Sequence, residues 1–290
     1  MVEPRFRWIL AAPVGLSPEL ASAARAQGLS ERMAGLLAHR GVHDPAELAA
    51  WFADPMDGLH DPALLPDVDR LLERMTLART RDERVLVFGD FDADGLTGLT
   101  IMTLALRRFG LTVEPYVPSR LDEGHGLSVA AIDAAVVGGA TVIVTVDCGT
   151  TSLAEIALAG TRGVDVIVTD HHRVPPELPA AVAIVNPHRA DSTYPDARLA
   201  GSGVAFKIAQ LLLRDEPGGP AAALALADLA TIGSVADVAP GAPGRAGGST
   251  SPPTAFRRRS PSCARAPRLA ASRLSSGPRP TAPARRANSS

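Results

Sequence analysis

A short apolar run that ends in alternating carboxylates constrains the fold of this 290-residue chain more than any other stretch. Residues 85–88 (VLVF) are β-branched, aliphatic and aromatic, and Gly89 and Asp90 follow them directly. An apolar run of this length, closed by glycine and aspartate, is typical of a strand buried in a parallel sheet. The segment 96–109, closed by Gly110, has the length and pattern of a helix. The sequence therefore predicts a strand–loop–helix unit with carboxylates in its loop.

The carboxylates are Asp90, Asp92 and Asp94. If the extended conformation continues through them, the strand period of two points all three the same way, toward the edge where open α/β sheets place their ligands. Three anions spread over about 7 Å repel one another, so some must be protonated unless a cation neutralises them. A hard divalent metal ion removes this repulsion and prefers oxygen ligands. The spacing therefore predicts one corner of a metal site.

Strand and helix patterns alternate from residue 84 onward, which predicts βαβ units in an α/β fold with one parallel, Rossmann-like sheet. The expected strands are 85–88, 112–117, 142–146, 166–169 and 182–185, and the expected helices are 96–109, 127–138, 152–160, 203–214 and 220–230.

Residues 1–80 are predicted to be a helical lead-in to the 81–240 domain. One helix is expected to open at Ser17 and another at Asp44, because a capping residue followed by proline is a typical helix start. A third amphipathic helix is expected over 68–78.

The charge is unevenly distributed, and it sets the last 50 residues apart. All 31 acidic residues precede position 241, whereas residues 241–290 hold ten arginines and no Val, Ile, Lys, Asp or Glu. Such a segment buries too little apolar surface to offset its chain entropy, so it is predicted to be disordered. Two origins remain open, a natural basic tail and the out-of-frame product of a GC-rich gene that lost its second domain. The second is favoured, because the body is already arginine-biased, with Lys207 as its only lysine.

The remaining composition concerns compartment and partners. The acidic body lacks the basic face expected of a simple nucleic-acid binder. Cys148 and Cys263 give neither a disulfide framework nor a zinc-site spacing, which suits a reducing cytosol. The amino terminus has no apolar core of signal-peptide length, and no run of 18 apolar residues occurs. We therefore expect a soluble, cytoplasmic protein with no membrane partner.

Further polar clusters follow other predicted elements. Asp147 follows the strand 142–146, the triplet Asp170-His171-His172 follows the strand 166–169, and Asp237 follows the last expected helix. Because carboxyl ends of parallel strands share one edge, these groups are expected to converge with the first cluster. Carboxylates and imidazoles without cysteine suit Mn²⁺ or Mg²⁺, and Zn²⁺ less well. The donors exceed the needs of one ion, and two ions about 3.5–4 Å apart are the usual device for displacement at phosphorus. The pattern therefore predicts metal-assisted phosphoester hydrolysis.

Each signal taken alone has a simpler interpretation. An aspartate after a strand, such as Asp147, is often a turn former or helix cap, and the pair His171 and His172 could be loop residues. A calcium loop is disfavoured because the string follows a strand and its twelfth position is Ile101. The DxDx[TV] nucleophile motif of haloacid-dehalogenase-like phosphatases is disfavoured because Asp94 stands at its fifth position.

Four motifs together resemble the DHH phosphoesterase superfamily, in its order: GDFDADG at 89–95, VDCG at 146–149, DHH at 170–172 and GSVADV at 233–238. The surrounding segments LLAHRGVHDPAELAAWFADP, VPSRLDEGHGLS, NPHR and LAGSGVAFKIAQLL are similar to the RecJ family of single-strand-specific exonucleases, over residues 30–240. The resemblance implies a site for two Mn²⁺ (or Mg²⁺) ions and 5′-to-3′ degradation of single-stranded DNA in repair and recombination. It also implies single-strand-binding protein and a helicase as partners.

The resemblance also implies roles for individual residues. Metal ligands would be Asp90, Asp92, Asp94, Asp147, His171 and Asp237, with Asp147 bridging the ions; the catalytic set would be Asp147, His171 and His172. His172 would contact the scissile phosphate, and Asp170 would orient a histidine from behind. Further phosphate contacts would come from Arg120 and from the helix start at Gly201 and Gly203.

The chain departs from this family in two places. His125 stands where the family usually has tyrosine, and the family's second catalytic-region domain has no counterpart after Pro240. Two alternatives therefore stay open. One is a DHH hydrolase of short oligonucleotides or cyclic dinucleotides, and the other is an inactive truncated fragment whose basic tail only tethers nucleic acid.

Overall fold

The computed structural model describes residues 14–53 and 59–238. Three helices near the amino terminus, α1 (Pro18–Ala26), α2 (Glu31–Ala38) and α3 (Pro45–Phe52), share a small core that includes Leu20 and Leu48. Ser17 caps α1 by accepting from Leu20 N–H, and Asp44 caps α3 in a reciprocal capping box. The expected helix starts are confirmed. The sequence analysis missed α2, although Ser30 caps it.

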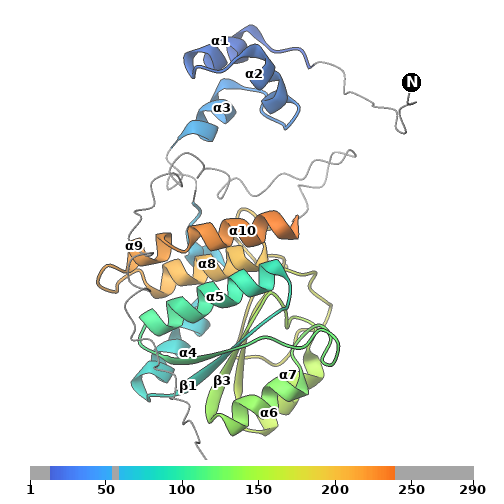
Figure 1. Ribbon diagram of the computed structural model, residues 1–290, viewed down its shortest axis with the longest axis vertical. Coiled ribbons are helices and arrows are strands. Elements are labelled where there is room, and N and C mark those ends of the chain that lie inside the picture. Colours follow the sequence, from blue (N-terminus) through green and yellow to red (C-terminus); the bar gives the residue numbers. More distant parts are fainter. Residues whose placement is uncertain (1–13, 54–58, 239–290) are drawn as a thin grey trace, which may run out of the picture. The chain divides into compact units, whose positions relative to one another are not determined.

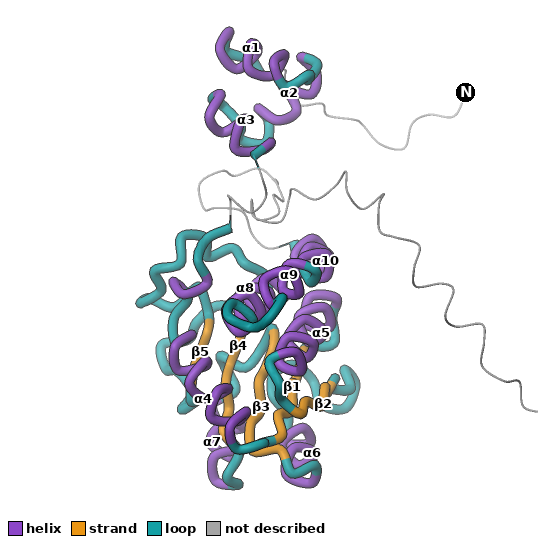
Figure 2. Tube along the Cα trace, turned by 90° about the vertical axis from the view of Figure 1, so that its left-hand side faces the viewer, coloured by secondary structure: helices purple, strands orange, loops and turns teal. Residues whose placement is uncertain are grey.

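A five-stranded parallel sheet forms the centre of the following domain, and it confirms the predicted α/β class. Figure 2 shows the strands in the order β2-β1-β3-β4-β5. Their bounds are β1 (Arg84–Gly89), β2 (Thr112–Tyr116), β3 (Ala140–Val146), β4 (Asp165–Thr169) and β5 (Ala183–Val185).

Helices cover both faces of this sheet (Figure 1). Preceding the sheet are the short η2 (Pro62–Leu64) and α4 (Val68–Thr80); after β1 come α5 (Ala93–Arg108), α6 (Val129–Val137), α7 (Leu153–Thr161), α8 (Gly201–Leu212), α9 (Gly219–Leu224) and α10 (Ala227–Asp237). The strand period divides the core. Val85 and Val87 pack with α4, α5 and α8 on one face, while Leu86 and Phe88 pack with α6 and α7 on the other.

Two boundaries differ from the expected ones in ways that affect the site. The strand β1 ends at Gly89, and α5 begins at Ala93, three residues earlier than predicted. The expected helix 220–230 is two helices, and α10 continues to Asp237, so the GSVADV segment lies within a helix. Packing of α10 against α5 and α8 explains the extension, because tertiary contacts stabilise a helix more than propensity does.

The expected compartment and domain limits stay predictions. By length and composition, the stretch Gly219–Asp237 is apolar enough to cross a membrane, which is weak evidence because core helices of soluble proteins pass the same test. The absence of a membrane partner therefore stays a prediction. The boundaries at residues 80 and 240 also stay predictions, and the predicted disorder of 241–290 concerns residues outside the described ranges.

Candidate metal centre

Two buried atoms at the carboxyl edge of the sheet lie close together without a hydrogen bond. Asp147 follows β3 with a left-handed φ of 63°, and His171 follows β4. The Oδ1 atom of Asp147 lies 3.0 Å from Nε2 of His171, but neither atom has a hydrogen-bond partner among the described residues. Orphaned buried donors and acceptors are rare in native proteins. A shared metal ion would satisfy both atoms, so these residues fit a metal site.

The electrostatics of this pair point the same way. Burial raises the pKa of Asp147 to about 7, and the neighbouring Asp94 carboxylate adds to the shift while His171 opposes it. Burial alone would lower the pKa of His171, but the adjacent Asp147 carboxylate outweighs burial and raises it. The raised pKa means that burial destabilises the ionised form of Asp147 unless a positive charge lies nearby. A divalent cation supplies that charge.

Asp94 joins this pair from the first turn of α5. Its side chain is 1% exposed, and Oδ2 lies 3.8 Å from Nε2 of His171. Oδ2 accepts a hydrogen bond from Gly201 N–H at 2.6 Å, and Oδ1 accepts one from Ser202 N–H at 3.0 Å. These are the first amides of α8, whose cap residue Ala200 offers no side-chain bond. Asp94 therefore caps a helix 107 residues away in sequence, which holds its carboxylate in a fixed orientation.

Asp237 completes the cluster from the last residue of α10. Its ligand oxygen lies within 4.8 Å of the ligand oxygen of Asp94 and of a ring nitrogen of His171. A second triad with the same limit consists of Asp147, His171 and His172. Burial raises the pKa of Asp237, and the carboxylates of Asp94 and Asp92 raise it further. His171 belongs to both triads. Two neighbouring groups of potential ligands that share one histidine are suited to a pair of ions.

Asp170 and His172 form a separate, well-connected pair beside the cluster. Asp170 Oδ1 lies 2.8 Å from His172 Nδ1 and accepts from the backbone N–H groups of His171 and His172, while Oδ2 accepts from Thr150 N–H. Hydrogen bonding to Asp170 raises the pKa of His172 to about 9. Although burial opposes it, the bonds from His172 lower the pKa of Asp170 to about 2. The side chain of His172 is 56% exposed to solvent.

The expected alignment of the first three carboxylates is wrong, because the chain turns into α5 instead of staying extended. Asp90 accepts from Phe91 N–H, and its Oδ2 lies 3.3 Å from Nδ1 of His125. Asp92 is exposed and caps α5 by accepting from Gly95 N–H at 2.8 Å. Only Asp94 points into the buried cluster. The ligand roles of Asp90 and Asp92 stay predictions. Asp92 lies close enough to Asp237 for its negative charge to raise the pKa of Asp237.

Phe91, Arg120 and His125 form a cluster next to Asp90. Phe91 contacts two side chains, with the Arg120 guanidinium carbon 5.1 Å and the His125 ring centroid 4.7 Å from its ring centroid. Arg120 and His125 are both exposed. The structure therefore places Arg120 beside the GDFDADG loop, and its role as a phosphate contact stays a prediction.

The predicted phosphate sites at the start of α8 have less freedom. The N–H of Gly201 is occupied by Asp94, and Gly203 is buried in the first turn of the helix. A phosphate at Gly201 would have to displace a carboxylate. At Gly201 the backbone N–H already donates to Asp94 and is not free for a phosphate. The phosphate-binding role of Gly201 and Gly203 stays a prediction.

The sequence analysis assigned no role to Asn186 and His188. Asn186 is fully buried after β5 and donates through Nδ2 to Thr150 Oγ1 and to the carbonyl of His172, so it supports the histidine loop. Burial lowers the pKa of His188, and the nearby His171 adds to that effect. The signal was present, because Asn186 follows a strand in the same way as Asp90, Asp147 and Asp170.

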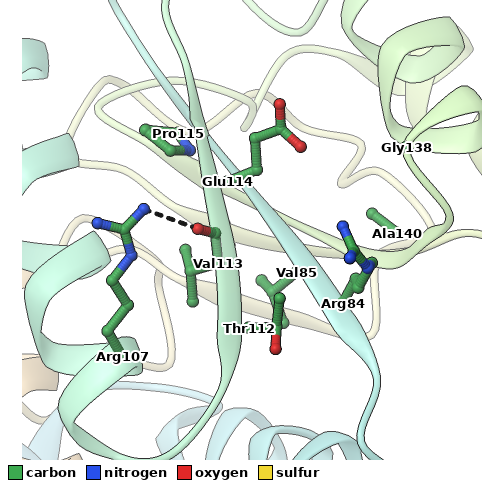
Figure 3. Close-up of a pocket in the computed structure, with 9 residues that line it drawn as sticks. All are labelled: Arg84, Val85, Arg107, Thr112, Val113, Glu114, Pro115, Gly138 and Ala140. Atoms are coloured by element: carbon green, nitrogen blue, oxygen red, sulfur yellow. Dashed lines mark hydrogen bonds between the residues drawn. The ribbon is translucent and has the colours of Figure 1, made fainter.

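A separate hollow of about 210 Å³ lies at the opposite, amino-terminal end of the strands (Figure 3). Arg84, Arg107, Glu114 and Gly138 are among its lining residues, and Arg107 donates to the carbonyl of Val113 at 2.9 Å. None of the residues predicted to be functional lines it. This hollow therefore lies apart from the candidate metal centre.

Known proteins that are similar to this chain include members of the DHH family and an exonuclease. The model of the DHH family, N-terminal domain, matches residues 84–234. The chain is 36% identical over 218 residues to the single-stranded-DNA-specific exonuclease RecJ of Bacillus subtilis strain 168, covering 75% of this chain and 27% of that protein.

Two solved structures are also similar. An exonuclease RecJ bound to manganese gives a TM-score of 0.52 at 36% identity, over 60% of this chain and 44% of the other. RecJ from Thermus thermophilus in complex with Mn²⁺ gives a TM-score of 0.56 at 28% identity, over 78% and 32%. The chain thus spans less than half the length of each of these relatives.

Proposed function

The chain belongs to the DHH family, and from this premise we propose that it is a metal-dependent phosphodiesterase that removes nucleotides from the 5′ end of single-stranded DNA. The observation that carries the proposal is the orphaned pair of Asp147 Oδ1 and His171 Nε2, 3.0 Å apart and buried beside Asp94. Similarity to RecJ exonucleases, two of them solved with manganese, supports the same assignment.

The proposed metal ligands are Asp147, His171, Asp94 and Asp237, with Asp92 and Asp90 as further candidates at the rim. Bound Mn²⁺ or Mg²⁺ ions would lower the pKa of a water molecule and withdraw charge from the phosphoryl oxygens. The protein contributes the arrangement of the ligands. Asp94 is held by two backbone amides and Asp147 by burial, so neither carboxylate has to reorganise when substrate arrives.

His172 is the proposed contact to the scissile phosphate. Its Nδ1 is engaged by Asp170, which directs the opposite nitrogen, Nε2, outward. In the metal-free chain the bond to Asp170 raises the pKa of His172 to about 9, and a ring protonated in this way would offer Nε2–H and a positive charge to a phosphoryl oxygen. Arg120 would contact a neighbouring phosphate from the rim.

The wider cellular role is also a proposal. We infer that the protein acts on single-stranded DNA, which its similarity to a single-stranded-DNA-specific exonuclease supports. A role in repair and recombination in the cytoplasm, together with single-strand-binding protein and a helicase, is part of the same proposal and follows from the resemblance of the sequence motifs. The proposed domains are a phosphoesterase domain over 81–240 and a helical lead-in before it, and the match of the family model to residues 84–234 supports the first of them.

A nuclease assay tests the proposal. The full chain is incubated with Mn²⁺ and either a long single strand, labelled at its 5′ or 3′ end, or a dinucleotide. We expect mononucleotides from the long strand, with the 5′ label released first, and no release in EDTA. Asp147→Ala should abolish release, whereas the surface control Asp133→Ala on α6 should retain it. Turnover of the dinucleotide alone would assign the chain to the short-oligonucleotide hydrolases, and no turnover of either would contradict the proposal.

A further inference from the structure

One glycine touches both buried carboxylates of the candidate metal centre. Gly201, the first residue of α8, donates its N–H to Oδ2 of Asp94 at 2.6 Å. On its other side, a Cβ atom added at Gly201 would lie 2.5 Å from Cβ and 2.6 Å from Oδ1 of Asp147. Real Cβ atoms do not approach other atoms this closely. The backbone of Gly201 therefore lies so close to Asp147 that only glycine fits at this position.

Backbone conformation does not explain this glycine. Gly201 is not among the glycines with a positive φ, and it occupies the first position of a regular helix, where alanine is a good helix former. The requirement for glycine is therefore steric. It arises from the Asp147 side chain, and the closest atom is Cβ, which cannot swing away as the end of a flexible side chain could.

The position of Gly201 links two distant parts of the chain. Asp94 lies in α5 and Asp147 follows β3, and both face Nε2 of His171, at 3.8 Å and 3.0 Å. The helix α8 is anchored by fully buried residues such as Val204 and Ile208, so its first residue has little freedom to move. The spacing between the two carboxylates is thus set by a rigid element that lies between them.

We propose that Gly201 is a positioning residue, which fixes Asp94 and Asp147 at the separation that the metal centre requires. The proposal rests on the proposed function, because it takes these two carboxylates to be metal ligands. Its consequence is that one added methyl group at position 201 weakens metal binding while the fold is kept.

A second glycine acts on the other oxygen of Asp94. A Cβ atom at Gly233 of α10 would lie 2.6 Å from Asp94 Oδ1 and would also clash with the hydroxyl oxygens of Ser202 and Thr97. The helix α10 therefore closes over the carboxylate that α8 holds. Gly233 gives an independent way to disturb Asp94 from a different helix.

The test is Mn²⁺ binding to the full metal-free chain, measured by calorimetry and by electron paramagnetic resonance, next to the thermal midpoint of each variant. Gly201→Ala is compared with Gly160→Ala in α7, where an added Cβ would meet nothing within 4 Å. Ile132→Ala, in the core between α6 and the sheet, controls for a loss of stability far from the site. We expect Gly201→Ala to bind Mn²⁺ about 10- to 100-fold more weakly, as when groups that orient metal ligands are altered, and both controls to bind like the wild type.

Unchanged Mn²⁺ affinity in Gly201→Ala, within twofold of the wild type, would overturn the positioning role. So would an equal loss of affinity in Ile132→Ala, because stability alone would then explain the effect. If Gly201→Ala does not fold, Gly233→Ala decides by the same criterion, and failure of both to fold would assign these glycines to the fold alone. A wild-type chain that binds no Mn²⁺ is a different result, since it contradicts the proposed function itself.

Discussion

Asp170 Oδ1 lies 2.8 Å from His172 Nδ1, and this bond sets both the orientation and the charge of the exposed histidine. The carboxylate is itself fixed by three backbone N–H groups, so it acts as a rigid support. A histidine oriented in this way leaves a single ring nitrogen, Nε2, for other partners.

The first prediction concerns the pKa of His172 in the metal-free chain. Asp170→Asn should lower it from about 9 toward the ordinary value of about 6.5, because the largest cause of the shift is the bond to the carboxylate. The measurement is an NMR titration of the imidazole C–H resonances. A pKa that stays near 9 in the variant would show that Asp170 is not the cause.

The second prediction concerns stability against pH. The pKa of His172 is higher in the folded than in the unfolded chain, so its contribution to stability is complete below about pH 6.5 and is lost as the pH rises through about 9. Replacing His172 by Gln should therefore flatten the fall in unfolding free energy across this window. Urea denaturation of both chains between pH 6 and 9.5, with metal removed, measures the difference. Parallel profiles would contradict the assigned shift.

The third prediction concerns heat stability with metal. A ligand at about 100 times its dissociation constant stabilises the folded state by about 2.7 kcal/mol, which corresponds to about 5–10 °C in Tm for a domain of this size. Mn²⁺ should raise Tm by that amount, EDTA should reverse the effect, and His171→Ala should remove it. Asp133→Ala, an exposed change on α6, should show the full shift. A shift retained in His171→Ala would place the bound ion elsewhere.

The fourth prediction concerns Arg120, which is exposed and lies over the Phe91 ring. If it contacts a phosphate, Arg120→Ala should weaken binding of single-stranded DNA uniformly across sequences and reduce the slope of log affinity against log salt by about 0.7. Fluorescence anisotropy at several salt concentrations measures this, and Arg81→Ala, at an exposed position between α4 and the amino-terminal end of β1, is the matched control. An unchanged slope would leave Arg120 as a solvated surface residue.

The sequence was most informative where the motifs coincide with strand ends. Asp147 and the segment from Asp170 to His172 follow β3 and β4 as expected, because parallel strands necessarily bring their carboxyl ends to one edge. Asn186 after β5 follows the same rule, so its position in the sequence could have pointed to it although it was not predicted.

What the sequence did not predict depends on contacts between distant segments. The inward direction of Asp94 follows from the early start of α5 and from the two amides of α8. The position of Asp237 follows from the packing of α10 on α5 and α8, which extends the helix beyond its apparent end. A local pattern contains neither the length of α10 nor the approach of Gly201 to Asp147, because both are set by tertiary packing.

The most direct test of the central claim is a Mn²⁺ titration of the metal-free chain followed by electron paramagnetic resonance. We predict two bound ions per chain in the wild type, and a loss of affinity greater than about 100-fold in Asp147→Ala, since altering groups that only orient ligands already costs about 10- to 100-fold. A wild-type chain that binds no Mn²⁺, or an Asp147→Ala chain that binds it as tightly as the wild type, would contradict the metal centre described here.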